Sequence, residues 1–175
     1  MKRNSFSINP FVYFAVFMAT LIAMIVAVTL VVKSCYASPS HKSIQEFCQY
    51  VLKNGKTVEG MKMAYIESIE PDDDGINKFY ATVSFGVTSE GQLFVTRIDL
   101  IQEFWASKDG LDYVIQLIVS DMFADGLADM GSCGGMTFQN GMLLMDTRSP
   151  LSEQETERQF DRLFYRFFLK MGKVI

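Results

Sequence analysis

Few residues in this 175-residue chain could do chemistry, and they are scattered. The only histidine, His41, has no obvious partner for a Cys-His or Ser-His-Asp site. The loop 132–135 (Ser-Cys-Gly-Gly) resembles a nucleophile loop, but no base is placed for it. The acidic run 72–74 lacks the alternating ligands and the late glutamate of a calcium loop, so we expect a solvated turn. The sequence therefore predicts a protein that is not an enzyme, with no catalytic, cofactor-binding or metal-binding residues.

The element expected to position the rest is the apolar stretch Phe11–Val32. Its 22 residues carry no charge, enough for a helix to cross the roughly 30 Å hydrocarbon core of a bilayer. A cleaved signal peptide ending near Ala37 is the alternative, but its apolar region is usually shorter. The predicted organisation is a cytoplasmic tail over 1–10, a transmembrane helix over 11–33, a linker over 34–40 and a folded domain over 41–175.

Small side chains form a ridge along this predicted span. They recur at every fourth position, and such spacing lets two membrane helices approach closely. The ridge predicts a homo-oligomer that assembles through Ala15, Ala19, Ala23 and Ala27.

Charge is shared unevenly along the chain. The formal net charge is −4, and three basic residues precede position 34, which leaves −7 for the remainder. An acidic domain is a poor binder of nucleic acid or anionic lipid. The basic amino terminus favours a cytoplasmic N-terminus. We therefore predict a single-pass protein of the inner (cytoplasmic) membrane with a periplasmic C-terminal domain and no nucleic-acid partner.

Three cysteines would then lie in an oxidising compartment. Cys48 and Cys133 could form a disulfide, which would leave Cys35 free to cross-link two copies. An equally good interpretation makes Cys48 an ordinary buried apolar residue of a helix.

Hydrophobic periodicity predicts the elements of the domain. We expect a helix over 41–53, ended by Asn54-Gly55, then strands over 61–69, 79–87 and 93–98. Helices over 100–106 and 111–124 follow, then an irregular glycine-rich stretch over 126–135. Asn140-Gly141 predicts a hairpin between 136–139 and 142–148. Ser152 and Glu155 form a capping box for a final helix that ends at Gly172.

The predicted fold class is therefore α+β. One N-terminal transmembrane helix precedes an antiparallel sheet of about five strands, which is packed with helices.

This order of parts resembles the holins of T-even-type bacteriophages. The most local part of the resemblance is the stretch SCGGMTFQNGMLLMDTRSPLSEQE, a cysteine loop followed by a glycine turn, a strand and an acidic-capped helix. The resemblance implies a protein that oligomerises in the inner membrane, permeabilises it for host lysis, and binds an antiholin-like regulator through its periplasmic domain. The chain departs from the pattern, because its N-terminal tail is short and its final helix has no cysteine. The alternative is a bitopic scaffold or assembly subunit of the cell envelope, whose domain docks protein partners.

Overall fold

The computed structural model describes residues 18, 38–58 and 60–172 of the chain. In residues 38–58 and 60–172, eight strands and two helices follow one another in the order α2 His41–Asn54, β1 Lys56–Val58, β2 Met63–Asp72, β3 Gly75–Val87, β4 Leu93–Lys108, β5 Leu111–Asp121, β6 Met130–Gln139, β7 Met142–Asp146, β8 Ser149–Pro150 and α3 Glu153–Lys170.

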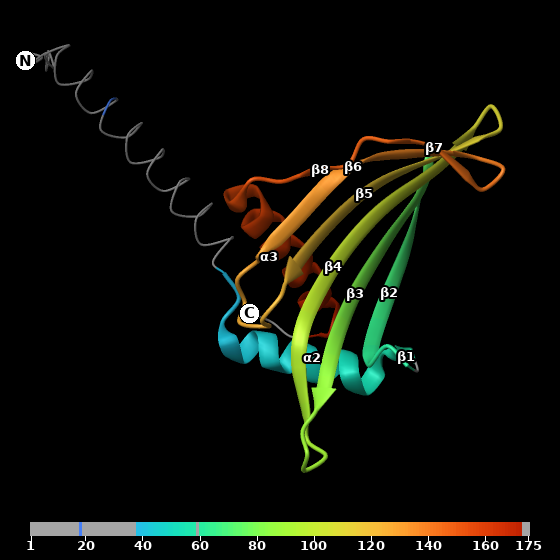
Figure 1. Ribbon diagram of the computed structural model, residues 1–175. Helices are drawn as coiled ribbons and strands as arrows, with labels where there is room; N and C mark the ends of the chain where they lie inside the picture. The colour runs from blue at the N-terminus through green and yellow to red at the C-terminus, as the bar shows by residue number, and fades with distance from the viewer. Residues whose placement is uncertain (1–17, 19–37, 59, 173–175) are drawn as a thin grey trace, which may run out of the picture. The chain divides into compact units, whose positions relative to one another are not determined.

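The strands form one antiparallel sheet in which neighbours along the chain are neighbours in space. The order is β1 to β7, and β8 pairs with β6 beyond the end of β7. Figure 1 shows the sheet curving, with α2 across one end and α3 behind it. Helix α2 packs on β2 and β3, and α3 packs on β4, β5 and β6, so the helices cover one face and leave the other open.

A single apolar core joins the helices to the covered face. Residues on neighbouring strands form fully buried rows, such as Ala81, Leu100 and Val119. The two helices meet where the rings of Phe47 and Phe164 lie 5.0 Å apart. Burying each large apolar side chain contributes about 1.5–3 kcal/mol to the stability of the fold. The contact between Phe47 and Phe164 therefore helps to hold the two helices together.

Several predicted elements are confirmed. The helix over 41–53 is α2, which Ser40 caps by accepting a hydrogen bond from the Ser43 amide at 3.2 Å. The predicted start of α3 is also confirmed: Ser152 accepts from the Glu155 amide at 3.4 Å, while the Glu155 carboxylate accepts from the side chains of Arg158 and Gln159. Asn140 and Gly141 have φ angles of 50° and 78°, as a two-residue hairpin of type I′ requires.

The predicted helices over 100–106 and 111–124 are wrong. Both segments are strands, β4 and β5, and Asp109-Gly110 is a second tight hairpin turn with φ angles of 54° and 77°. Apolar side chains occupy both faces here: Leu100 points to the covered face, and Ile101 and Trp105 point to the open one. Because both faces are apolar, the period of two is hidden, and a continuous apolar run cannot be told from a buried helix by periodicity.

The glycine-rich stretch predicted to be irregular is largely β6. Its glycines permit close packing: a Cβ on Gly134 would lie 2.5 Å from the Cα of Arg148, and one on Gly131 would lie 2.7 Å from the Thr156 hydroxyl oxygen. The strand count is eight and not about five, because β5 was predicted as a helix and β1 and β8 are too short to show an alternating pattern.

The predicted single-pass membrane architecture is also corrected. Within residues 38–58 and 60–172, no helix is both long and apolar enough to cross a bilayer. The physical reason is that α2 and α3 are amphipathic, with charged residues on the sides that face away from the core. The predicted inner-membrane location with a periplasmic domain is therefore not supported. The segment on which that prediction rested, 11–32, lies outside the described residues except for Met18, as do Ala15, Ala19, Ala23, Ala27 and Cys35.

Candidate functional site

The residues considered for nucleophilic chemistry are engaged in structure. His41 lies exposed at the start of α2 and hydrogen bonds to the Gln45 side chain at 2.9 Å. Cys48, seven residues further along α2, is buried. Burial, with a smaller contribution from the negative charge of Asp121, raises the pKa of the Cys48 thiol to about 12. The thiolate is the nucleophilic form of cysteine, so Cys48 is held in its unreactive form.

The structure contains no bridge between the two domain cysteines. Cys48 and Cys133 are both free thiols. Cys133 lies on β6 opposite Leu117, packed against the core. Cys48 is a buried apolar residue of α2.

The buried Asp121 serves the loop that follows β5. Its carboxylate accepts hydrogen bonds from the backbone amides of Phe123, Asp125 and Gly126 at 3.1, 3.2 and 2.8 Å. Burial nevertheless raises the pKa of Asp121, because it outweighs the lowering effect of these three amides. We assign this carboxylate to holding the loop.

The acidic turn between β2 and β3 is a local structure. Asp72 accepts a hydrogen bond from the Asp73 amide at 2.8 Å and from the Asn77 side chain at 3.1 Å. Among residues 38–58 and 60–172 no cluster of histidine, cysteine, aspartate and glutamate has the arrangement of a metal site.

The two edges of the sheet differ sharply in chemistry. The β1–β2 edge is short at β1, and the part of β2 beyond it carries Glu67, Glu70 and Pro71. Charged side chains and proline are the means by which proteins prevent a free edge from pairing with another strand. This edge is therefore protected.

The opposite edge, β7, has less protection, because its only charged residue is Asp146 at its carboxyl end. Four consecutive large apolar residues are all exposed: Met142 by 70%, Leu143 by 48%, Leu144 by 53% and Met145 by 54%. On its inner side β7 pairs with β6, and no described strand pairs with its outer side. A row of backbone donors and acceptors lies there beside apolar side chains, which is the arrangement that accepts an added strand.

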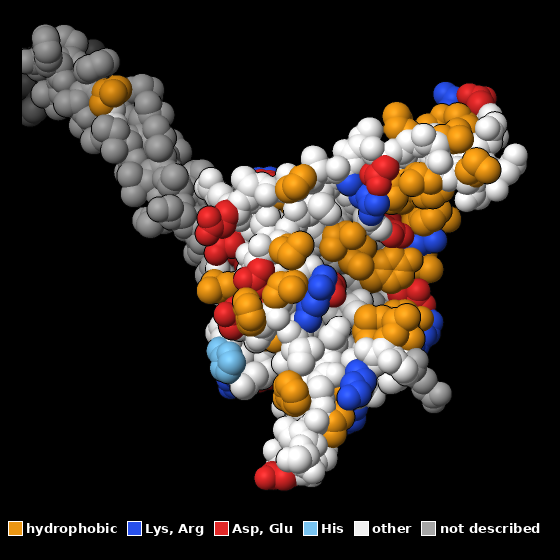
Figure 2. All heavy atoms as spheres, viewed as in Figure 1, with side chains coloured by type: hydrophobic (Ala, Val, Ile, Leu, Met, Phe, Trp, Pro, Cys, Tyr) orange, Lys and Arg blue, Asp and Glu red, His pale blue; other side chains and the backbone are white. Residues whose placement is uncertain are grey.

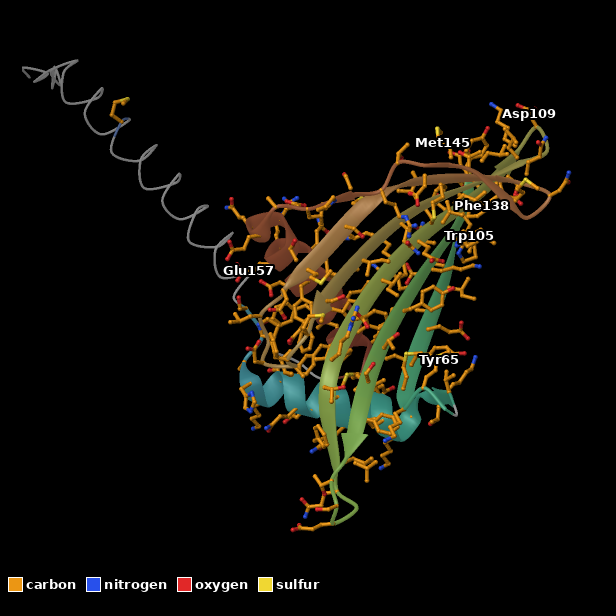
Figure 3. The ribbon with its side chains drawn as sticks, in the orientation of Figure 1. Tyr65, Trp105, Asp109, Phe138, Met145 and Glu157 are labelled. Carbon is orange, nitrogen blue, oxygen red and sulfur yellow. The ribbon has the colours of Figure 1, made fainter. Side chains whose placement is uncertain are left out.

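The apolar surface continues from β7 onto the neighbouring hairpin. We define the arm as residues 104–115 and 136–145, the ends of the β4–β5 and β6–β7 hairpins. Figures 1 and 3 show the arm projecting beyond the helices, with Asp109 at its tip and Met145 and Phe138 along it. Exposed Tyr113 and Ile115 add to it, and hydrophobic side chains gather there in Figure 2.

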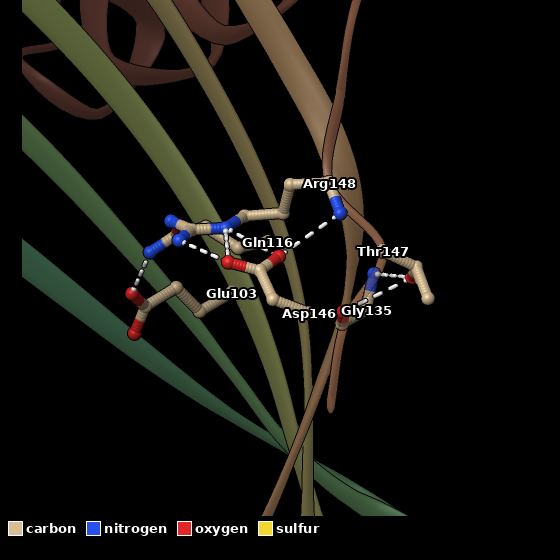
Figure 4. Close-up of polar contacts among 6 residues, drawn as sticks. All are labelled: Glu103, Gln116, Gly135, Asp146, Thr147 and Arg148. Atoms are coloured by element: carbon tan, nitrogen blue, oxygen red, sulfur yellow. Dashed lines mark hydrogen bonds and ion pairs between the residues drawn. The ribbon is translucent and has the colours of Figure 1, made fainter. Parts of the chain in front are cut away.

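A hydrogen-bond chain on the open face fixes the base of this edge. The Trp105 indole donates to Glu103 at 2.8 Å, and the Gln116 amide donates to the same carboxylate at 2.7 Å. Arg148 then donates to the Gln116 carbonyl oxygen at 2.9 Å and grips Asp146 through bonds of 2.6 to 3.1 Å (Figure 4). This series of hydrogen bonds connects β4 and β5 to the end of β7 and the residues that follow it.

The same segment is fastened to β6. The Thr147 side-chain oxygen accepts from the Gly135 amide at 3.1 Å and donates to the Gly135 carbonyl at 3.0 Å (Figure 4). The hydrogen bonds from Arg148 lower the pKa of Asp146 to about 2, so the pair stays ionised at neutral pH. The carboxyl end of β7 and the residues after it are thus fastened to β5 and β6, while no described strand pairs with the outer side of β7.

A groove of about 870 Å³ borders this network on the open face. Arg97 and Ser120 line it, and both bond to Asp99: Arg97 Nε donates to its carboxylate at 2.8 Å, and the Ser120 hydroxyl donates to the same group. Arg148 lines the other end and is engaged as described above. Both arginines of the groove are thus engaged by carboxylates, and the exposed edge of β7 is the stronger candidate for recognition.

Comparisons with known proteins place no relative beside this fold and edge: no family model, no curated protein and no solved structure matches the chain.

The sequence patterns had identified 142–148 as one strand of a hairpin without marking it as a site. The available signal was the run Met-Leu-Leu-Met after the Asn-Gly turn, which is apolar on both faces. That it lies at an edge depends on the pairing of the whole sheet.

Proposed function

We propose that this chain is a docking subunit, which binds an extended segment of a protein partner by adding it as a strand to the outer side of β7. The observation that carries the proposal is the exposure of all five residues of β7 at a sheet edge where the first four are apolar. In strand addition, backbone hydrogen bonds supply affinity, and side chains that alternate along the added strand supply specificity.

The support behind β7 favours this mode of binding. A strand that receives another must have an ordered backbone, and the Arg148–Asp146 pair and the Thr147–Gly135 bonds fasten the carboxyl end of β7 and the residues that follow it. Without that support the entropy of ordering a mobile edge would oppose binding.

The apolar side chains favour a protein partner. Met142, Leu144 and the adjoining residues of the arm offer apolar area beside a row of backbone groups, a combination that an extended peptide segment satisfies. Methionine suits such a surface, because its flexible side chain adapts to the partner.

A non-enzymatic role is part of this proposal. The side chains that could take part in catalysis make the structural contacts described above: Cys48, Asp121 and His41. The lysis function implied by the holin resemblance stays a prediction, since it requires the segment that lies outside the described residues.

The experiment is a comparison of complex size for three chains, each expressed in cells, cross-linked there with formaldehyde so that a weak complex survives dilution, and then extracted. Native chain should elute as a complex larger than its own 19.8 kDa. Leu144→Lys places a charge on the open edge and should elute as the single chain. Ile69→Lys is the matched control, because Ile69 is similarly exposed, at 56%, on the protected β2 edge, and it should elute like the native chain. Co-elution of Leu144→Lys with the native complex would contradict the proposal.

A further inference from the structure

We infer that the strand added to β7 is the β7 of a second copy of this chain, paired antiparallel about a two-fold axis at Leu144. The inference rests on the proposed docking function and names its partner. A two-fold interface requires a surface that is complementary to itself. The sequence and charges of β7 meet that requirement.

The register follows from the symmetry. With Leu144 opposite its own copy, Leu143 lies opposite Met145 of the second copy, and Met142 lies opposite Asp146. The three central positions, 143 to 145, are all apolar, and facing apolar pairs stabilise antiparallel strands.

Charge also permits this pairing. The stretch from Met136 to Met145 contains no charged residue, so the first charge on either strand is Asp146. In this register the two Asp146 residues lie four positions apart along the ladder, about 14 Å at 3.4 Å per residue. That separation exceeds the roughly 10 Å over which salt screens charges, so their repulsion is small.

Each Asp146 also brings its own counter-charge. Arg148 of the same chain holds it through bonds of 2.6 to 3.1 Å. The second copy's Met142 therefore meets a neutralised ion pair, whose arginine stem offers apolar surface. An edge with charges of only one sign would lack this neutralisation within each copy.

The size of the surface limits the strength of the pairing. Four residues that are 48% to 70% exposed offer on the order of 100 Å² each, about 400 Å² per copy, against about 800 Å² per partner in a stable complex. Leu144 has no partner in β6, because the β6–β7 register shifts there, and such bulges twist a strand and shorten the ladder. The dimer is accordingly weak. It forms where copies are concentrated or held together.

A disulfide trap tests this symmetry on the full chain in cells, in a background where Cys35, Cys48 and Cys133 are replaced by serine. Residues that face each other across antiparallel strands have Cα atoms about 4.5–5.5 Å apart, within reach of a disulfide. After oxidation with copper-phenanthroline, Leu144→Cys should give a disulfide-linked dimer of twice 19.8 kDa that a reductant separates into single chains.

Two controls make the trap specific. Met142→Cys lies on the same strand and is more exposed, but the two copies of residue 142 are about 14 Å apart in this register, too far for a disulfide. Ile69→Cys lies on the other edge. Neither should form the dimer. Serine at position 48 is checked by urea unfolding, and if it unfolds the chain, alanine replaces it.

Each outcome decides. A dimer from Leu144→Cys alone supports the inference. A dimer from Met142→Cys of equal yield, or none from Leu144→Cys, overturns it. If Leu144→Cys gives no dimer but Leu144→Lys still releases the chain from its complex, docking stands and the partner is another protein. If neither change has an effect, the docking function falls as well.

Discussion

Asp161 gives a sharp test of the physical account, because a carboxyl group is buried on α3 where a charge is unfavourable. The side chain is only 5% exposed. Burial, with a smaller contribution from Glu157, raises the pKa of Asp161 from 3.8 to about 6. The perturbation is Asp161→Asn, which keeps the shape and removes the ionisation.

The sign follows from linkage. The folded state binds the Asp161 proton more tightly than the unfolded chain, so ionising this carboxyl weakens the fold as the pH rises from about 4 to about 6. A shift of two pKa units corresponds to about 3 kcal/mol at 1.36 kcal/mol per unit, an upper limit for this site. Asp161→Asn should therefore raise the free energy of unfolding by about 1–3 kcal/mol at pH 7.5 and leave it nearly unchanged at pH 3.5.

Urea unfolding of the native and variant chains at a series of pH values measures this difference. Other carboxylates, such as Glu70 and Glu155, have lowered pKa values because of bonds to basic or amide side chains, and they stabilise the fold as the pH rises. Their contribution cancels in the difference between the two chains. Glu157→Gln is the companion variant and should recover a small part of the same gain. A difference between native and Asp161→Asn that does not vary with pH would refute the reasoning.

Three further predictions concern the structural residues around the site. Asp121→Ala removes the acceptor of three backbone amides and should lower the free energy of unfolding by about 2–4 kcal/mol, measured by urea unfolding. Gly134→Ala places a Cβ 2.5 Å from the Arg148 Cα, so it should speed amide exchange in β6 and in residues 146–150 while leaving α2 unchanged; equal exchange in both chains would contradict the close packing. Cys48, with its pKa raised to about 12, should react with a thiol reagent at pH 8 only after denaturant is added, whereas rapid reaction in the folded chain would show that the thiol is accessible and ionised.

Local signals predicted the elements whose ends have their own chemistry. Ser40 and Ser152 begin helices by accepting amide hydrogen bonds, and Asn140-Gly141 adopts the left-handed angles of a tight hairpin. Each of these depends on residues within a few positions, so the sequence is enough to identify them.

The central strands and the site could not be predicted in the same way. β4 and β5 are apolar on both faces, so their period is hidden, and the Asp109-Gly110 turn was interpreted as a break between helices. The exposed state of Leu144 depends on which strands pair across the whole sheet, and on the absence of a described neighbour beyond β7. Burial and edge position are properties of the fold, and no window of sequence contains them.

Photo-cross-linking from position 142 tests the docking edge most directly. A photoreactive residue replaces Met142 on β7. The second substitution is made at another position, Leu144 or Ile69, so the cross-linking residue is the same in every chain. The account predicts a discrete adduct in cells, lost with Leu144→Lys and retained with Ile69→Lys. An adduct that persists in Leu144→Lys, or no adduct in the native background, would contradict the claim that β7 is the surface this protein uses.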